Sequence, residues 1–483
     1  MPNHGMPHSF RVKPFIAKCG TRCIKGLVEV HRILQLNMVL KPSLIVLFIL
    51  PGLVFCAPAA SEAPTVTAST IASAASSTPT VPYISTDPNE SLWSEDSADP
   101  SALQPVRGKL GAPFLRPAPA ENIPIDTQNP DLLAPPSTDS GAVMNAKWPF
   151  SLSHMRLQTG GWVREQNAGV MPISTTIASA NMRLEKGSIR ELHWHTTSEW
   201  SYVLKGSTQI TAVDDQGRNY VATVEPGDLW YFPAGIPHSL QATGEDEGGS
   251  EFLLIFDDGN FGEDSTFSLI DWLDHIPAEV LQKNFQVDAS AFAHIPGKEL
   301  YIFPSTTLPE DDSLAPQSPQ GTVPLPYSFA LSKANGTQTS GGSYKVVDSS
   351  TFEISKTIAM AEVTVEPGAM RELHWHPTQD EWSYFLEGQG RVTIFAARGR
   401  ARTFNYQSGD IGYVPAGMGH YVENIGNTTL KFMEIFKTDR FQDISLNQWL
   451  ALTPSHIVKS HLNVDDETIA LMSKTKPVVI GPS

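Results

Sequence analysis

Two histidines and one glutamate stand close together in a short line that this chain carries twice. Residues 190–200 read RELHWHTTSEW, and residues 371–382 read RELHWHPTQDEW. Side chains two positions apart on a β-strand point to the same face, so His193 and His195 would project together. Glu199 follows at or after a turn, from which it can fold back toward them. The spacing predicts that two imidazoles and one carboxylate meet at one point.

A second motif adds a third imidazole to each set. In the stretch 227–238, GDLWYFPAGIPH, glycine and proline predict a turn that delivers His238. Three imidazoles and one carboxylate, without sulfur, suit Mn(II) or Fe(II) in octahedral geometry with two open positions, whereas structural zinc prefers a closed tetrahedral site. A lone histidine is more often a core residue than a ligand, but two complete sets in parallel register favour metal sites. The second set consists of His374, His376, Glu381 and His420.

The repeat extends beyond the ligands and predicts the architecture. Matching ligands lie 181 or 182 positions apart, and SLIDWLDHIPAEVL at 268–281 matches SLNQWLALTPSHIV at 445–458, which predicts a terminal helix after each copy. Short apolar runs such as WSYVLKG and GDIGYVPAG, broken by glycine and proline, are typical of an all-β sandwich or barrel. The chain is therefore predicted to hold two homologous β-domains in tandem with flanking helices. We place them at 104–325, which includes an extended arm, and at 326–483.

The N-terminal region predicts a secretory route. Residues 43–57, SLIVLFILPGLVFCA, form an apolar run that ends in small residues, as a signal peptide does, and the run is short and proline-interrupted for a membrane span. We predict a signal peptide at 38–59 and a Ser/Thr/Ala/Pro-rich spacer at 60–103. Residues 1–37 precede it as an extension, which reflects either a misplaced start codon or the basic cytosolic tail of a signal anchor. The mature protein is expected to be extracellular, either free or associated with a cell wall.

Cysteine content and charge exclude several kinds of chemistry and partner. All three cysteines precede residue 60, so the mature chain would have no disulfide, thiol nucleophile or thiolate-bound metal. Residues 1–59 hold seven of the 34 Lys/Arg and one of the 51 acidic residues, which leaves 27 against 50, a net charge of −23. Such a chain repels nucleic acid and anionic membranes, so a small anionic substrate must meet a locally positive metal or arginine. Glycosylation acceptor sequences at Asn89, Asn335 and Asn427 fit a secreted glycoprotein.

The two motifs of each copy resemble those of cupins. Glycines flank each histidine pair, and a Gly, Pro, Gly and His set forms the second motif. One departure is Ala242, where the motif usually has Asn, although that position is not a ligand. The matching residues are Gly187, Gly206, Gly227, Pro233 and Gly235 in the first copy, and Gly368, Gly388, Gly409, Pro415, Gly417 and Asn424 in the second.

Within cupins, the chain resembles the bicupin oxalate decarboxylases from about Gln104 to Lys476. The stretches VTVEPGAMRELHWHP, ARTFNYQSGDIGYVPAGMGHYVENIG and FDDGNFGEDSTFSLIDWL carry the resemblance. It implies two tandem jelly-roll-like barrels, Mn(II) in both domains, dioxygen as a catalytic co-substrate, and conversion of oxalate to formate and carbon dioxide. It also implies a homo-oligomer, built as trimers paired into hexamers.

An arginine stands three residues before the first histidine of each set. Arg190 and Arg371 are placed to hold the second carboxylate of oxalate, and a guanidinium fork would supply the positive charge that the rest of this acidic chain lacks. The alternative is a structural ion pair with the neighbouring Glu191 or Glu372.

The two copies differ in the loop that follows the last long strand. The first copy has a longer, glycine-containing loop, DDGNFGEDST at 257–266, which in the decarboxylases is a lid. Glu263 falls on the catalytic glutamate of that lid, a general acid/base, whereas Gly262 and Asp264 replace the Ser and Asn of the usual pattern. Retention of the glutamate favours decarboxylation over oxidation to carbon dioxide and hydrogen peroxide.

A further difference places Glu434 of FMEIF where the first copy has Leu254 of FLLIF. A carboxylate on an apolar strand is costly unless it is paired or used, so Glu434 is either a proton donor at the second site or a buried partner of Arg371. The first copy is therefore predicted to be the main catalytic site. The alternatives are an oxalate oxidase, a storage-type bicupin without activity, and a dioxygenase acting on a larger organic substrate.

Overall fold

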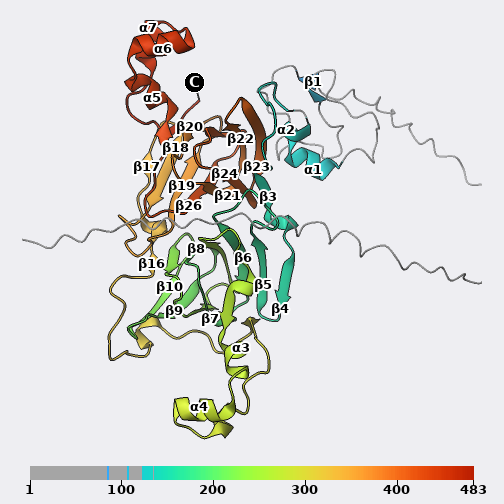
Figure 1. Ribbon diagram of the computed structural model, residues 1–483, viewed down its shortest axis with the longest axis vertical. Coiled ribbons are helices and arrows are strands. Elements are labelled where there is room, and N and C mark those ends of the chain that lie inside the picture. The colour runs from blue at the N-terminus through green and yellow to red at the C-terminus, as the bar shows by residue number, and fades with distance from the viewer. Residues whose placement is uncertain (1–83, 86–105, 108–121, 134, 483) are drawn as a thin grey trace, which may run out of the picture. The chain divides into compact units, whose positions relative to one another are not determined.

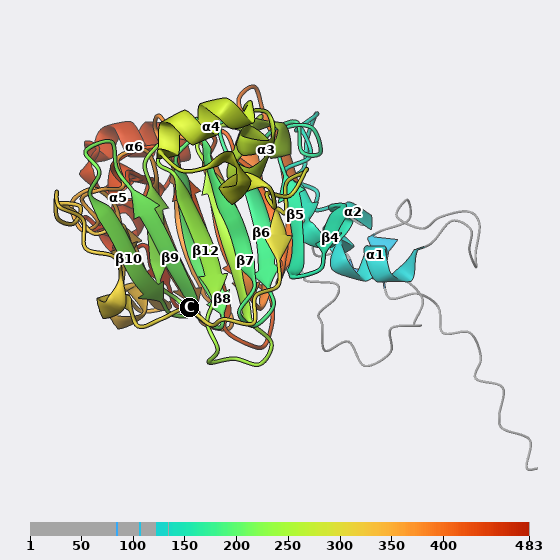
Figure 2. The ribbon, with the colours of Figure 1, turned by 90° about the horizontal axis from the view of Figure 1, so that it is seen from below.

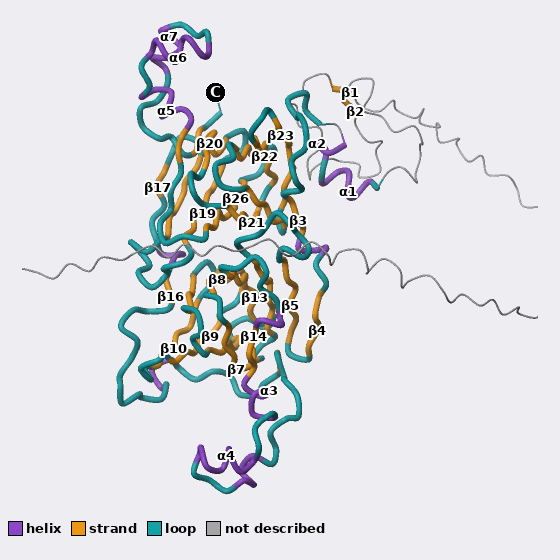
Figure 3. Tube along the Cα trace, in the orientation of Figure 1, coloured by secondary structure: helices purple, strands orange, loops and turns teal. Residues whose placement is uncertain are grey.

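Antiparallel strands make up most of the regular secondary structure in the part of the chain that the structure describes (Figure 3). The computed structural model describes residues 84–85, 106–107, 122–133 and 135–482, all within one compact unit that spans 77–483. The predicted extension and signal peptide, the three cysteines, Asn89 and nearly all of the predicted spacer lie outside the described residues. The prediction of tandem β-barrels with flanking helices is confirmed.

The first barrel consists of two sheets, whose strands between residues 155 and 256 appear in teal to green in Figure 1. One sheet has the order β16(Ser328–Phe329), β11(Leu229–Phe232), β8(Glu199–Lys205), β13(Ser250–Phe256), β6(Ala178–Leu184), β5(Gly161–Gln166) and β4(Met155–Gln158). The other has the order β10(Asn219–Val224), β9(Thr208–Val213), β12(His238–Ala242), β7(Ile189–His195) and β14(Thr266–Ser268), with β15(Ile302–Phe303) also on β7. Figure 2 shows β10, β9, β12 and β7 side by side, as their pairing requires.

The second barrel repeats this plan. One sheet has the order β17(Thr337–Gln338), β18(Gly342–Val347), β19(Ala359–Val365), β26(Leu430–Phe436), β21(Glu381–Glu387), β24(Asp410–Val414) and β3(Lys147–Pro149). The other has the order β23(Arg400–Gln407), β22(Gln389–Ala396), β25(His420–Asn424), β20(Met370–Trp375) and β27(Ile444–Ser445), with β28(Val479–Ile480) also on β20.

Strand β8 is apolar on both of its faces because each face is buried in a different core. Trp200 and Tyr202 belong to a core cluster that also contains Trp382 and Tyr384 of the second barrel, whereas Val203 belongs to the interior core of the first barrel. Alternate side chains thus face the other barrel and the barrel interior. A buried aromatic ring removes about 150–250 Å² from water, worth up to about 4–6 kcal/mol, so the contact between the barrels is a substantial source of stability.

The arm before the first barrel packs on the second barrel. Its helices are α1(Ile123–Gln128) and α2(Pro130–Leu133), and Asp131 in α2 is buried against Arg391, with a 2.9 Å contact between Oδ2 and Nε. Farther along, β3 pairs with β24 as an edge strand of the second barrel, while β16, beyond residue 326, pairs with β11 of the first. Each barrel is therefore completed by a segment from the other side of the predicted boundary at 325 and 326.

The predicted terminal helices are each split in two. The first is α3(Leu269–Asp274) and α4(Ala278–Phe285), and the second is α5(Leu446–Leu452) and α6(Ser455–Leu462), followed by α7(Asp466–Leu471). Pro277 and Pro454 stand directly before α4 and α6. A proline excludes the helical conformation from the preceding residue, so one continuous helix was a wrong expectation. No helix of the described residues is long and apolar enough to cross a membrane.

Candidate metal centres

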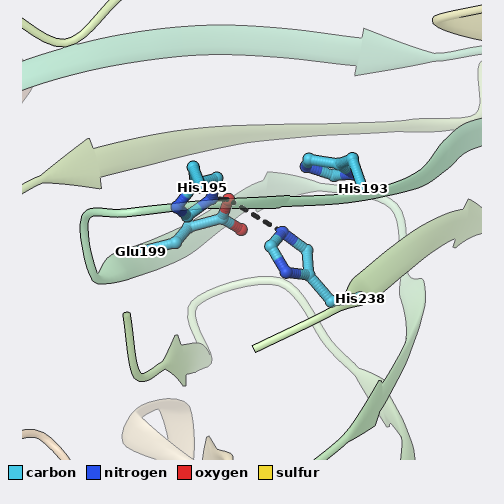
Figure 4. Close-up of side chains that lie close together, drawn as sticks. All are labelled: His193, His195, Glu199 and His238. Carbon is cyan, nitrogen blue, oxygen red and sulfur yellow. Dashed lines mark hydrogen bonds and ion pairs between the residues drawn. The ribbon is translucent and has the colours of Figure 1, made fainter. Parts of the chain in front are cut away.

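The first barrel brings its four predicted ligands together at one end of three strands. His193 and His195 lie on β7, while Glu199 and His238 are the first residues of β8 and β12. All four are buried, and their ligand atoms lie within 4.8 Å of one another. His238 pairs with His193 across the sheet, which sets the third ring beside the first two. Figure 4 shows the carboxylate of Glu199 between His195 and His238.

The second barrel repeats the cluster with the same strand roles. Strand β20 carries His374 and leads into His376, and Glu381 and His420 are the first residues of β21 and β25. These residues are also buried, with ligand atoms within 4.8 Å of one another, and His374 pairs with His420 across the sheet. The described residues thus contain two like clusters of three imidazoles and one carboxylate.

Hydrogen bonds to main-chain carbonyls orient all six imidazoles. In each ring Nδ1–H donates at 2.6–3.0 Å, so that Nε2 carries the lone pair that a metal would use. The acceptors are the carbonyls of Glu191, Thr197 and Ile236 for His193, His195 and His238, and those of Glu372, Gln442 and Met418 for His374, His376 and His420.

The Nε2 atoms of the histidines and the ligand carboxylates are arranged as the ligands of a cation would be. His374 Nε2 is buried without a hydrogen bond, and Nε2 of His238 and His376 lies 3.4 and 3.0 Å from the ligand carboxylate without hydrogen-bond geometry. A lone pair that faces a carboxylate oxygen in a buried site is repulsive unless a proton or metal ion lies between them. The donor set of nitrogen and oxygen without sulfur is the one expected for Mn(II) or Fe(II).

The pKa shifts of His193 and Glu199 in the first cluster favour the protonation states that bind a metal ion. Burial holds the pKa of His193 well below its usual value, and the charge of Arg190 lowers it further. Burial alone would raise the pKa of Glu199, but contacts with His238 and His195 bring that pKa well below its usual value. Neutral imidazole and ionised carboxylate are the forms that bind metal ions.

Arg190 lies beside the first cluster, and its described contacts are with uncharged groups. Its Nη1 donates to the carbonyl of Tyr301 at 3.2 Å, and its guanidinium carbon lies 3.9 Å from the centroid of the Tyr301 ring. None of the described carboxylates forms an ion pair with it. The adjacent Glu191 instead accepts from the main-chain N–H groups of residues 270, 300 and 301, so the alternative of an Arg190–Glu191 pair is not what the structure contains.

Arg371, the counterpart in the second barrel, is held by two buried carboxylates. Its Nε donates to Glu434 at 3.0 Å and its Nη2 donates to Asp443 at 2.7 Å, and all three side chains are at most 3% exposed. The sequence left two interpretations of Glu434, and the structure contains the buried ion pair with Arg371. Burial raises the pKa of Glu434, although Arg371 opposes that shift. Glu372 accepts from Ser445 and Val478 rather than from Arg371.

Glu263 opens a short 3-10 helix, Glu263–Ser265, at the end of the lid. The structure describes its backbone, and its side chain lies outside the described part, so its role stays a prediction. The base of the lid is fastened where Asn167 donates to the carbonyl of Phe261 at 3.2 Å. Phe261 stacks on Phe256 with centroids 3.6 Å apart and lies 5.5 Å from the ring of His195.

Sequence reasoning missed the groups that hold the ligand carboxylates. Trp230 donates from Nε1 to the Oε1 of Glu199 at 2.9 Å. Gly412 stands at the same place in the second barrel, and there the hydroxyl of Ser383 donates to the Oε1 of Glu381. The signal that could have found this difference is GDLWYF against GDIGYV, where the repeats exchange a tryptophan for a glycine.

Comparisons with known proteins agree with this geometry. The Cupin family model matches the chain twice, over residues 153–291 and 328–470. The chain is 52% identical over 380 residues to the oxalate decarboxylase OxdC of Bacillus subtilis, which covers 78% of this chain and 96% of that protein. It is 44% identical over 370 residues to a probable oxalate decarboxylase of Arthroderma benhamiae, covering 74% of this chain and 89% of that one.

Solved structures give the same picture. Oxalate decarboxylase from Bacillus subtilis at pH 4.6 matches with a TM-score of 0.75 and 51% identity, over 79% of this chain and 98% of that chain. Another structure of the same enzyme, which concerns its Mn(II) centres, matches with a TM-score of 0.76 and 50% identity, over 79% and 100%. The chain belongs to the cupin family and, within it, to the bicupin oxalate decarboxylases.

Proposed function

We propose that this chain decarboxylates oxalate to formate and carbon dioxide, with two Mn(II) ions per chain and dioxygen as a catalytic co-substrate. The observation that carries the proposal is the first cluster, where three imidazoles and one carboxylate lie buried beside an arginine without a described carboxylate partner. The relative that is 52% identical over 96% of its own length is an oxalate decarboxylase.

The reaction determines what the residues must do. Hydrogen oxalate becomes formate and carbon dioxide when one carbon–carbon bond breaks and one carbon–hydrogen bond forms, with no net oxidation. One proton must leave the carboxyl group and one must reach the carbon. His193, His195, Glu199 and His238 would hold the metal ion, which with dioxygen would supply a Lewis acid and a temporary electron acceptor.

Arg190 would bind the substrate carboxylate that the metal does not. Its guanidinium is buried, fixed by the Tyr301 carbonyl and ring, and free to donate to a planar carboxylate. Because the chain is strongly acidic, this cation and the metal would supply the attraction for a small anion. Glu263 would act as general acid/base, taking the proton of hydrogen oxalate and returning it to the carbon.

Product analysis tests the proposal directly. Doubly carbon-13-labelled oxalate is given to the Mn-loaded protein in aerated, mildly acidic buffer, and the products are followed by NMR. We expect formate and carbon dioxide to appear in equal amounts. Glu263→Gln should abolish formate, while Asp264→Asn, a change of the neighbouring lid carboxylate, should retain it. Loss of formate in both variants, or in neither, would contradict the role given to Glu263.

The second candidate function is oxalate oxidation, because the lid sequence departs from that of the decarboxylases. Gly262 and Asp264 depart from the decarboxylase pattern at the positions that flank Glu263. Carbon dioxide with hydrogen peroxide and no formate in the wild-type protein would identify an oxidase. Two buried ligand clusters argue against a storage protein without activity.

We also propose that the protein is secreted, free or bound to a cell wall, and glycosylated. Support comes from the predicted signal peptide and from Asn335 and Asn427, which are both exposed and therefore open to a glycosyltransferase. Expression with the native N-terminus in a eukaryotic host, followed by peptide mapping of the medium, tests this. Protein that stays inside the cell with unmodified Asn335 and Asn427 would contradict the proposal.

A homo-oligomer, a hexamer by resemblance, is the proposed assembly. Both barrels expose a tryptophan on their helices and a leucine on the ligand strand, namely Trp272 with Leu192 and Trp449 with Leu373. These four side chains are 46–58% exposed. Large apolar side chains exposed at equivalent positions of both barrels are suited to contacts between chains of an oligomer. Sedimentation equilibrium should give a mass of six chains, and Trp449→Glu should lower it.

A further inference from the structure

The loops that follow the last long strand of each barrel are fastened in different ways. The lid covers residues 257–266, and its counterpart, here called the second loop, covers residues 437–443. In the second barrel, the ligand His376 donates from Nδ1 to the carbonyl of Gln442 at 2.8 Å, so a metal ligand holds the loop. In the first barrel the matching His195 donates instead to the carbonyl of Thr197, in the turn before β8, and its contact with the described part of the lid is the ring of Phe261, whose centroid lies 5.5 Å away.

Asp443, the last residue of the second loop, lies between two cations. Its Oδ2 accepts from Nη2 of Arg371 at 2.7 Å, its Oδ1 accepts from Nζ of Lys476, and Lys476 also donates to the main-chain carbonyl of Asp443 at 2.8 Å. The carboxylate is 3% exposed. Nothing comparable links the described side chains of the lid to Arg190. The second loop is therefore tied to the arginine of its own barrel.

The charges around the two arginines differ accordingly. Glu434 and Asp443 together offset the charge of Arg371, and they occupy its Nε and Nη2 donors. Among the described groups, the partners of the Arg190 side chain are a neutral carbonyl and an aromatic ring. A dicarboxylate that enters the second barrel would face two buried carboxylates around a guanidinium that keeps only Nη1 without a described hydrogen-bond partner. Its binding is opposed by repulsion and by the loss of existing bonds.

A cavity of about 590 Å³ lies outside this arrangement. Phe441, Asp443 and Lys476 are among its lining residues, whereas the fully buried Arg371 is not. Asp443 thus separates a solvent-facing cavity from the arginine. A small anion that reached the cavity would meet the Asp443–Lys476 pair before it could contact Arg371.

We propose that Asp443 is a specificity-determining residue that excludes oxalate from the second barrel, because it fastens the second loop across Arg371 and occupies the guanidinium that would otherwise bind substrate. This inference rests on the proposed function, in which the first barrel binds oxalate through Arg190. Each chain then binds one oxalate although it holds two metal ions.

Binding stoichiometry of the Mn-loaded protein, measured without dioxygen by equilibrium dialysis with labelled oxalate, tests the proposal. The wild-type protein should bind one oxalate per chain, and Arg190→Leu should bind none. Asp443→Ala should bind two, and the double variant Arg190→Leu/Asp443→Ala should bind one. The Mn(II) electron paramagnetic resonance signal should respond to oxalate in the double variant and stay unchanged in Arg190→Leu.

Two further variants keep the test decisive. Asp443→Asn removes the charge at nearly constant volume, and it should also raise the stoichiometry above one. Asp439→Asn is the matched control, since Asp439 is an exposed carboxylate of the same loop that contacts Ser349 rather than Arg371, and it should leave the stoichiometry at one.

The outcomes separate the two proposals. Two Mn per chain with one oxalate in both Asp443 variants would overturn the role of Asp443. Loss of the second Mn in both variants, with two Mn retained in Asp439→Asn, would overturn it as well, since Asp443 would then support the metal site. A wild-type protein that binds no oxalate, or Arg190→Leu that still binds one, would overturn the proposed function instead.

Discussion

Substitution by leucine should mainly lower stability at Arg371 and mainly lower kcat/KM at Arg190. Arg371→Leu leaves the buried Glu434 without its ion-pair partner, and it leaves Asp443 with Lys476 alone. Breaking a buried ion pair costs about 3–5 kcal/mol, which lowers the unfolding temperature of a domain of this size by roughly 6–20 °C. Turnover at the first site in the protein that remains folded should change less than about tenfold.

Arg190→Leu removes no partner of a buried carboxylate. The carbonyl of Tyr301 keeps a hydrogen bond from the N–H of Glu191 at 2.9 Å, and the lost stacking on the Tyr301 ring is worth about 0.5–2 kcal/mol. The unfolding temperature should therefore fall by only a few degrees. Two lost charge-assisted hydrogen bonds to oxalate, at about 1.5–3 kcal/mol each, lower kcat/KM by roughly 10²- to 10⁴-fold.

Differential scanning calorimetry and formate production, with manganese content measured on the same samples, distinguish the two effects. Arg183→Leu serves as the control, because Arg183 donates to the carbonyl of Gly248 and lies apart from both clusters, so neither stability nor turnover should change greatly. Equal loss of stability in Arg190→Leu and Arg371→Leu would refute the reasoning. So would an equal loss of kcat/KM in folded, Mn-loaded samples of both.

Three further predictions concern metal, pH and the arm. Chelation of the metal should lower the unfolding temperature and addition of Mn(II) should restore it, because the clusters pack lone pairs against a carboxylate, and calorimetry of both forms checks this. Burial opposes the shift, but hydrogen bonds from Ser350 and Phe441 and the charge of Arg440 lower the pKa of Asp348 below its usual value. Its contribution to stability is therefore full above about pH 5 and shrinks as the pH falls below about 4, so the stability difference between wild type and Asp348→Asn should vanish in acid. Asp131→Ala should cost up to about 3–5 kcal/mol in urea unfolding of the second barrel, since it removes the buried 2.9 Å ion pair of Arg391 and leaves the more distant, partly exposed Glu423 at 3.8 Å. An unchanged urea midpoint would contradict this prediction.

The ligand clusters could be predicted because their spacing is local. Two histidines on alternate strand positions and a glutamate after a short turn converge through strand geometry alone, and the repeat supplied a second instance of the pattern. His238 is farther away in sequence, but its glycine and proline turn marks where β12 begins. In these cases local geometry and chemistry point to the same side chains.

The partners of the arginines could not be predicted in the same way. Asp443 reaches Arg371 across 72 positions, and it lies among several charged residues of a loop that gives no sign which one points inward. Tyr301 follows a long helical excursion, and its contact with Arg190 depends on a main chain at φ 59°, which is rare for a side chain of that size. Such contacts depend on how loops return to the barrel rather than on periodicity.

The repeated arginine does one kind of chemistry in two settings. A guanidinium binds a carboxylate through parallel N–H donors whether that carboxylate belongs to a substrate or to the protein. In the second barrel, Glu434 and Asp443 supply two carboxylates of the protein to Arg371, where the substrate would supply one. In the first barrel, Leu254 replaces Glu434 and none of the described lid side chains pairs with Arg190, so the guanidinium can bind a substrate carboxylate. Both barrels can therefore keep their ligand cluster and their arginine while, as we propose, only the first barrel binds oxalate.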